Sequence, residues 1–427
     1  MILLFICLVF LGTIFLGVPL VWAIIVTAIL PIFVFDLGYP LQAVFLNLIG
    51  GVEPNHFIAI PLFIVAGELM GRGGVGQRII DFAKAAFGFL PGGLGFVVVG
   101  ASMLFGGISG SAIADSAAIG SVMIPNMAKQ GYSKAFAGGL VAAAGTIGII
   151  IPPSIPMLIY GFVGNVSVAD LFIAGIIPGL IFGLFFMGVC YHVGKKTGCD
   201  PGGLKTSQKE LWHAFTGSAP ALFMPVLILG GIFGGLVTPT EAAAVAVVYG
   251  FIVTVVIYRD FSLRDLPKLM IDSFVTSAIV MVVIGATSVL GWLITLEQLP
   301  QILVEFVQAV SSSPFTFLLL VNLVLLVLGL VLDPVPAILL TAPLFIPTAL
   351  TFGVDPVHLG VIMTCNVAVG LFTPPVGATL YVASRISGVG VLSIARAMAP
   401  LYLVAISALL LVTYVPAVSM TLVHFFR

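Results

Sequence analysis

Phe105-Gly-Gly-Ile-Ser-Gly-Ser-Ala-Ile-Ala-Asp115 lies in the middle of an apolar stretch that covers residues 91–125. A second apolar stretch, residues 315–350, is interrupted by Gly329-Leu-Val-Leu-Asp-Pro-Val-Pro336. Glycine, serine, aspartate and proline all disfavour a helix interior, so we expect each stretch to form two half-helices joined by a tip. What such a hairpin does depends on the solvent around it.

The composition indicates that this solvent is lipid. Hydrophobic residues make up 61% of the chain and charged residues 7%, whereas roughly a quarter of the residues of a soluble domain are charged. The formal net charge of -1 argues against a nucleic-acid partner. No metal-ligand or disulfide spacing links Cys7, Cys190, Cys199 and Cys365. We expect an all-α polytopic protein in the lipid bilayer, without a cofactor.

A helix needs roughly 20 apolar residues to cross the hydrocarbon core, and apolar segments of about this length occur in both halves of the chain. They are residues 1–17, 20–36, 56–71, 135–162, 169–193, 217–235, 241–258, 272–296, 356–384 and 398–420. The segment Met1–Trp22 lacks a basic start, which favours a retained span over the alternative of a cleaved signal peptide. Irregular backbone at membrane depth is tolerated only inside protein or beside a watery cavity, so the two tips are candidate sites.

The basic residues test this layout, because short loops rich in lysine and arginine stay in the cytoplasm. If both hairpins are re-entrant, only Arg427 falls on the outer face. The other basic residues then share the inner face: Arg72, Arg78, Lys84, Lys129, Lys134, Lys195, Lys196, Lys205, Lys209, Arg259, Arg264, Lys268, Arg385 and Arg396. Two full spans in place of a hairpin would give the same sidedness. Both termini are predicted to be periplasmic.

Sliding the chain against itself by about 220 residues reveals an internal repeat. The shift pairs Pro152-Pro153 with Pro374-Pro375, Ile124-Pro125 with Ile346-Pro347, Pro19 with Pro239, Gly67 with Gly285 and Asp115 with Asp333. Chance matches are the alternative in a chain with 27 prolines.

Each predicted half holds three spans, a re-entrant hairpin, a helix broken at Pro-Pro and a final span. The first repeat covers residues 1–193, with its broken helix at 135–162, and the second covers 217–427, with its broken helix at 356–384. A cytoplasmic linker, 194–216, joins them. An odd number of crossings per half inverts the second copy, so the two tips meet near the midplane, as in secondary transporters.

The first tip combines groups that suit a small cation. A half-helix ends near Gly107 and another begins near Ser111, so a helix C-terminus and a helix N-terminus face one space. Ser109, Gly110, Ser111 and Asp115 add hydroxyl, carbonyl and carboxylate oxygens, the hard ligands that alkali cations prefer. A sodium site is our interpretation; the alternative is that Ser111 is only an N-cap and Asp115 only complements the helix dipole.

The second tip and the two Pro-Pro breaks extend the predicted sodium region. Asp333-Pro334 is typical of an N-cap followed by proline at the first helical position. Each Pro-Pro pair leaves carbonyls without helical donors, and a kink that serves packing alone is the alternative. The further sodium candidates are Gly145, Thr146, Gly148, Gly329, Asp333, Gly370 and Thr373.

Short motifs bear on the energy source of the protein and on one enzyme activity. No GxxxxGK[ST] sequence occurs, which indicates an ion gradient rather than nucleotide hydrolysis. Gly107-Ile-Ser-Gly110 matches the GxSG of intramembrane serine proteases, with Ser109 as nucleophile. Such a nucleophile needs a histidine base, and His192 and His358 lie at predicted span ends. Proteolysis is therefore the distant alternative, and we expect no enzyme.

At these residues the chain resembles the large membrane subunit of tripartite ATP-independent periplasmic (TRAP) transporters. The motifs that carry the resemblance are Gly-Gly-Ile-Ser-Gly-Ser-Ala-Ile-Ala-Asp115, Ile-Pro-Pro153, Thr-Pro-Thr-Glu241 and Phe-Thr-Pro-Pro375, and the match covers essentially the whole length. The resemblance implies a multi-pass protein of the bacterial inner membrane with an elevator mechanism, similar to the ion transporter superfamily. It also implies sodium coupling, a small four-helix membrane subunit and a periplasmic substrate-binding protein that delivers a small organic anion.

The same resemblance makes the tips and breaks the substrate region, with a carboxylate such as a C4-dicarboxylate, sialic acid or sugar acid as the transported anion. The substrate candidates are Ser111, Pro153, Ser154, Pro375, Gly377 and Thr379. The opening Phe10–Trp22 is most similar to the sialic acid members. The alternative is a stand-alone sodium/dicarboxylate symporter, which would need no binding protein.

Overall fold

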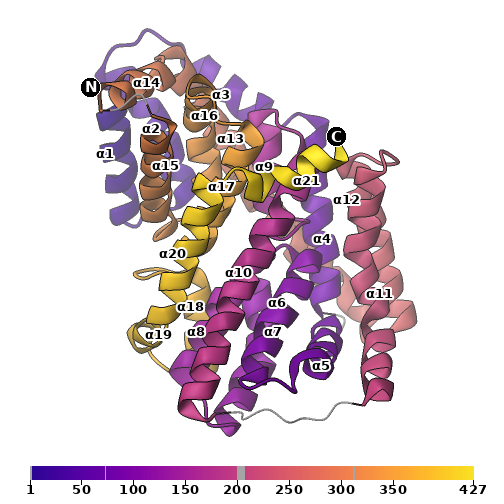
Figure 1. The fold of residues 1–427 in the computed structure, drawn as a ribbon. Helices are drawn as coiled ribbons and strands as arrows, with labels where there is room; N and C mark the ends of the chain where they lie inside the picture. The colour runs from indigo at the N-terminus through magenta and orange to yellow at the C-terminus, as the bar shows by residue number, and fades with distance from the viewer. Residues whose placement is uncertain (1, 73, 200–206, 311–312) are drawn as a thin grey trace.

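The computed structural model describes residues 2–72, 74–199, 207–310 and 313–427, and this part of the chain is helical without a strand (Figure 1). The first half contains α1 (Ile2–Phe15), α2 (Leu20–Val34), α3 (Leu41–Gly50), η1 (Asn55–Ile58), α4 (Ala59–Arg72), α5 (Val75–Phe87), α6 (Gly93–Ser109), α7 (Ala112–Lys129), α8 (Lys134–Gly145), η2 (Thr146–Ile149), α9 (Ile155–Gly164) and α10 (Val168–Thr197).

The second half follows a similar order of helices. It contains α11 (Gln208–Phe233), α12 (Pro239–Phe251), η3 (Ile252–Ile257), η4 (Leu263–Asp265), α13 (Leu266–Leu296), α14 (Leu299–Val310), α15 (Pro314–Gly329), α16 (Pro334–Thr351), α17 (Pro356–Gly370), α18 (Ala378–Ser387), α19 (Val391–Ala397), α20 (Ala399–Tyr414) and α21 (Ala417–Phe426).

Many of these helices are long and apolar enough to cross a bilayer. By length and composition, the described residues contain 5 such helices, or up to 9 if each bent pair counts as one span. The prediction of an all-α protein with several apolar helices is confirmed. In Figure 1 both termini lie toward one end of the molecule, and the end of α10 and the start of α11 lie toward the other.

The two interrupted stretches form helical hairpins. The first consists of α6 and α7, which pack against each other and are joined at Gly110-Ser111. The second consists of α15 and α16, joined by residues 330–333. Both are slightly longer than the predicted 91–125 and 315–350, because the flanking residues at Lys129 and Pro314 continue the helices.

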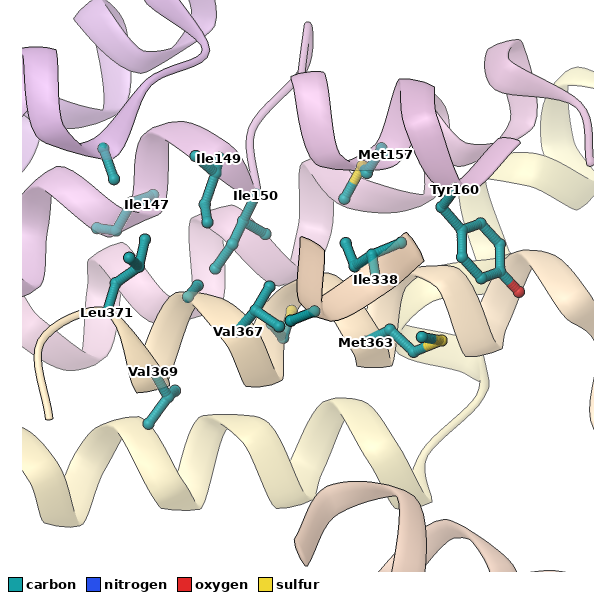
Figure 2. Close-up of a cluster of buried hydrophobic side chains, with 14 of the residues drawn as sticks. Ile147, Ile149, Ile150, Met157, Tyr160, Ile338, Met363, Val367, Val369 and Leu371 are labelled. Carbon is teal, nitrogen blue, oxygen red and sulfur yellow. The ribbon is translucent and has the colours of Figure 1, made fainter. Parts of the chain in front are cut away.

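Both Pro-Pro sequences break their helices, and both Pro-Pro peptide bonds are cis. The first broken helix is α8, η2 and α9; the second is α17 and α18. Figure 2 shows Ile147, Ile149 and Ile150 of the first break on the side that faces Val367 and Leu371 of the second half, and η2 and α9 both contact α17. The halves therefore share one apolar core at the level of the breaks.

Hairpins and broken helices exchange partners between the halves. Helix α7 packs against α8 of its own half and against α18 of the other half. In the same way, α16 packs against α17 of its own half and against α9 of the other half. Each hairpin is thus held between a first half-helix from its own half and a second half-helix from the other.

Some elements differ from the expectation. The linker predicted at 194–216 is shorter, because α10 continues to Thr197 and a capping box between Ser207 and Glu210 starts α11; residues 200–206 lie outside the described part. The amphipathic helices α5 and α14, which precede the two hairpins, were not expected, because their mixed polarity falls below a span-length apolar window. The short helix α3 was missed for its length.

Candidate functional site

The first tip is a turn between two helix ends. Gly110 adopts a left-handed conformation, with φ of 61°, and its backbone N–H donates to the Gly106 carbonyl at 3.0 Å, which ends α6. Ser111 is the N-cap of α7, and its hydroxyl accepts from the Ala114 N–H at 3.4 Å. Glycine suits the left-handed position because it has no Cβ. The capping role considered for Ser111 is confirmed, and it does not remove Ser111 from the tip.

Asp115 lies one turn into α7 and is completely buried. The Ser109 hydroxyl donates a hydrogen bond to its Oδ1, and the Ser111 N–H donates to the same Ser109 hydroxyl at 3.1 Å. Oδ2 of Asp115 has no hydrogen-bond partner among the described residues. A buried carboxylate oxygen without a partner is costly, so this oxygen is the strongest ligand candidate at the first tip.

Two glycines bring the first break against this carboxylate. A Cβ on Gly106 of α6 would collide with the Gly148 Cα of η2, and a Cβ on Gly148 would collide with Oδ2 of Asp115. Gly148 therefore lies directly beside the unpartnered oxygen. Of the predicted sodium residues, Ser109, Gly110, Asp115 and Gly148 are brought together here.

The remaining candidates of the first break lie around this centre. A Cβ on Gly145 would collide with the Ser116 hydroxyl of α7, so Gly145 also packs on the hairpin. The Thr146 hydroxyl donates to the Ala143 carbonyl at 2.8 Å, within its own helix. Pro153 and Ser154 line a small void of about 10 Å³ with Ser109 and Gly110, close to the space that one water molecule needs.

The second tip repeats the close glycine contact but not the carboxylate. A Cβ on Gly370 of α17 would lie 2.6 Å from the Gly329 Cα of α15, as Gly148 meets Gly106 in the first half. Asp333 is the residue before α16, where Ser111 precedes α7, and its side chain makes no capping hydrogen bond. In the second hairpin, Asp333 therefore occupies the position equivalent to Ser111, and not the position equivalent to Asp115 that the sequence shift suggested. The residue equivalent to Asp115 is Ala337.

Both tips open onto one cavity of about 510 Å³. From the first tip Ser109, Gly110 and Ser111 line it, and from the second tip Asp333 does. Its other walls include Ile149, Ile155, Pro156 and Leu371 from the two breaks and Gly67, Glu68, Arg72, Thr276 and Val280 from α4 and α13. The meeting of the tips, expected from the repeat, is thus seen as a shared cavity.

Part of the predicted substrate set does not reach this cavity. Pro375 is exposed but is not among the residues that line the cavity. The Thr379 hydroxyl donates to the Leu371 carbonyl at 3.0 Å. Gly377 adopts a left-handed conformation, with φ of 41°, before α18. Thr373, a predicted sodium residue, donates its hydroxyl to the Val369 carbonyl at 2.6 Å. From the second break, Leu371 lines the cavity instead.

Sequence reasoning missed the contribution of α4. Gly67 packs against the first tip, since a Cβ there would lie 2.8 Å from the Ser109 carbonyl oxygen. Glu68 and Arg72 follow on the same helix, form an i,i+4 ion pair at 3.1 Å and line the cavity. The sequence signal that could have indicated this contribution is Gly67 followed by the charged Glu68 and Arg72 in an otherwise apolar helix.

Comparison with known proteins gives a consistent result along the chain. Residues 6–418 match the family model described as "Tripartite ATP-independent periplasmic transporter, DctM component". The C4-dicarboxylate TRAP transporter large permease protein of Pseudomonas aeruginosa is 43% identical over 377 residues, which cover 87% of this chain and 86% of that protein. The sialic acid TRAP transporter large permease protein of Vibrio cholerae is 37% identical over 418 residues, 97% of each chain.

A solved structure shares the fold at much lower identity. The Neisseria gonorrhoeae MtrF structure has a TM-score of 0.60 and 15% identity, with 87% of this chain and 83% of that chain covered. At this identity the likeness concerns the fold alone. From the family model and the curated relatives, the chain belongs to the DctM component family of tripartite ATP-independent periplasmic transporters.

Proposed function

We propose that the chain carries out sodium-coupled secondary active uptake of a small organic anion that a periplasmic binding protein delivers, with a small membrane subunit as partner. The observation that carries the proposal is the shared cavity: two helix-hairpin tips line it, and behind one of them lies a buried carboxylate with an unpartnered oxygen. A sodium ion at Asp115 Oδ2 would satisfy that oxygen and offset the cost of its charge at membrane depth.

The electrostatics of the cavity also favour cation coupling. Glu68 and Asp333 line it as carboxylates, and Arg72 is the one basic residue among the described residues that line it. An organic anion entering such a space is repelled unless cations accompany it. Bound sodium would then raise the affinity for the anion, and by linkage the anion would raise the affinity for sodium.

The partner exchange of the hairpins supports two inverted repeats and an elevator movement. Each hairpin is held by half-helices from both halves, so the two hairpins and the two broken helices form one packed unit. We propose that this unit moves against α4 and α13, which pack on each other and on the hairpins. At one point of that boundary Gly67 meets the Ser109 carbonyl, so that α4 has no side chain to interlock there.

Of the two alternatives from the sequence, the protease is set aside and the stand-alone symporter is left to experiment. Family membership makes the chain a transporter permease and not an enzyme, and Ser109 donates its hydroxyl to Asp115 instead of to a histidine. The stand-alone symporter differs in needing no binding protein. Relatives named for C4-dicarboxylates and for sialic acid make succinate and N-acetylneuraminate the first anions to test.

The test is uptake of these two anions by proteoliposomes that contain the chain and its small membrane subunit. We expect uptake that needs an inward sodium gradient and the matching purified binding protein. Equal uptake without the binding protein would support the stand-alone symporter, and uptake driven equally by choline and sodium gradients would remove sodium coupling.

The proposed orientation predicts that cysteines at the bases of the two hairpin units label from opposite sides. Lys129 ends α7 and Asp355 precedes α17, and both are exposed. In a background without Cys7 and Cys199, a Lys129→Cys variant should react with a membrane-impermeant maleimide from the cytoplasm and an Asp355→Cys variant from the periplasm. Labelling of both from the same side would contradict the inverted repeat.

A second prediction concerns the sodium order of transport. Asp333 is the one carboxylate between Gly329 and Thr351, and its side chain is exposed in the shared cavity. If the second tip holds a cation through a carboxylate, Asp333 supplies it. We expect uptake by the unmutated protein to rise with more than the first power of sodium concentration, and Asp333→Ala to lower that power. The same power in both proteins would leave the second site without a carboxylate ligand.

A further inference from the structure

Arg72 lines the shared cavity and is the last residue of α4. It is five positions after Gly67, which touches the first tip, and this corresponds to about 7.5 Å of helix rise. Thr276 and Val280 of α13 also line this cavity. Arg72 thus borders the same cavity as the first tip, where an anion between the tips would lie.

Two carboxylates hold the guanidinium in one orientation. Nε of Arg72 donates to Glu68 Oε2 at 3.1 Å, and Nη2 donates to Asp272 Oδ2 on α13 at 2.7 Å. In the described part of the chain, Nη1 makes no hydrogen bond to protein, and the side chain is 35% exposed. A guanidinium anchored in this way keeps its Nη1 edge, with two N–H donors, free to hydrogen-bond a carboxylate.

An ordinary surface ion pair does not account for this arrangement. A bridge on a lipid- or water-facing helix contributes little and has no cavity at its free edge. Here Arg72 lines the same cavity as Ser111 and Asp333, where it is the one fixed positive charge among the described lining residues. Glu68 and Asp272 orient the guanidinium, but their negative charges also weaken its positive electrostatic potential in the cavity.

We propose that Arg72 binds the carboxylate of the transported anion through its Nη1 edge, with Glu68 and Asp272 as positioning residues. The inference rests on the proposed function, because it assigns a residue to that function's substrate. It predicts opposite effects for the two partners of one ion pair: removing the arginine weakens anion binding, whereas neutralising Asp272 leaves the arginine in the cavity with a stronger field.

The test is equilibrium binding of radiolabelled succinate or N-acetylneuraminate to the purified chain with its small membrane subunit at saturating sodium. Arg72→Gln should raise the Kd about tenfold or more, and Arg72→Lys should raise it less, because a lysine keeps the charge but loses the planar fork. Asp272→Asn should lower the Kd, because the amide oxygen still accepts from Arg72 while the loss of the negative charge strengthens the field of the guanidinium. The matched control is Arg78→Gln, since Arg78 pairs with Asp260 at 2.5 Å outside this cavity and its loss should not change the Kd.

Two results would overturn the assignment. One is an Arg72→Gln Kd within twofold of the unmutated value; the other is an equal rise in Kd for Arg72→Gln and Asp272→Asn, which would make the pair a brace between α4 and α13. Failure of the proposed function itself looks different, because the unmutated complex would then bind neither anion in a sodium-dependent way.

Discussion

Asp115→Ala is expected to abolish sodium-driven uptake while the protein still inserts in the membrane. The substitution removes a completely buried carboxylate whose Oδ1 accepts from Ser109 and whose Oδ2 has no hydrogen-bond partner in the described part of the protein. If a sodium ion supplies the missing partner, the loss of both oxygens removes its charged ligand. We expect uptake to fall to background in proteoliposomes, at any sodium concentration tested.

Asp115→Asn separates an ion ligand from a helix-capping role. Asparagine keeps an oxygen that can accept from Ser109 but removes a buried charge, which should raise the melting temperature in sodium-free buffer. Sodium should raise the melting temperature of the unmutated protein relative to choline and should have little effect on Asp115→Asn. The control is Asp81→Asn, since Asp81 lies exposed on α5.

Two outcomes would contradict a sodium-ligand role and support the alternative that Asp115 only complements the dipole of α7. One is an Asp115→Ala variant with normal sodium-driven uptake, and the other is a sodium effect on melting that survives in Asp115→Asn. Both measurements are needed, because uptake alone also falls when a variant misfolds. A folded Asp115→Asn variant with a raised basal melting temperature and no sodium response is the combination that a ligand role predicts.

Much of the fold could be predicted because lipid imposes strong local rules. An interruption in an apolar stretch must be buried or face a cavity. The interruptions at 105–115 and 329–336 were therefore sufficient to predict where both hairpin tips lie. Proline cannot donate a backbone hydrogen bond, so the two Pro-Pro sequences located both breaks. The carboxylate at Asp115 followed from the cost of an intramembrane charge.

The remaining parts depend on the register of helices, which composition does not encode. The pairing of Asp115 with Asp333 failed because a single sequence shift cannot absorb the different tip lengths; the tips are Gly110-Ser111 in one half and residues 330–333 in the other. Pro375 is exposed and Leu371 faces the cavity, a difference set by how the second break turns. Arg72 and Asp272, 200 residues apart, meet only through the packing of α4 on α13.

Gly148→Ala is expected to reduce uptake to less than about a tenth by forcing apart the two elements that surround the Asp115 carboxylate. An added Cβ would collide with Asp115 Oδ2 and would lie 2.9 Å from the Gly106 Cα. Neither neighbour can move alone, because one is buried on α7 and the other is backbone of α6, in the same hairpin. Overpacking of this kind costs about 1–3 kcal/mol or more.

The second half offers the companion variant Gly370→Ala, whose Cβ would lie 2.6 Å from the Gly329 Cα without touching a carboxylate. A matched control is Gly188→Ala on α10, where the added Cβ meets nothing within 4 Å. Uptake and sodium-dependent melting should be measured for all three. We expect Gly148→Ala to lose both, Gly370→Ala to lose uptake, and Gly188→Ala to keep both, since alanine also favours the helix. Normal uptake by Gly148→Ala would mean that the sodium region tolerates separation of the first hairpin from its break, and the carboxylate would then act without η2.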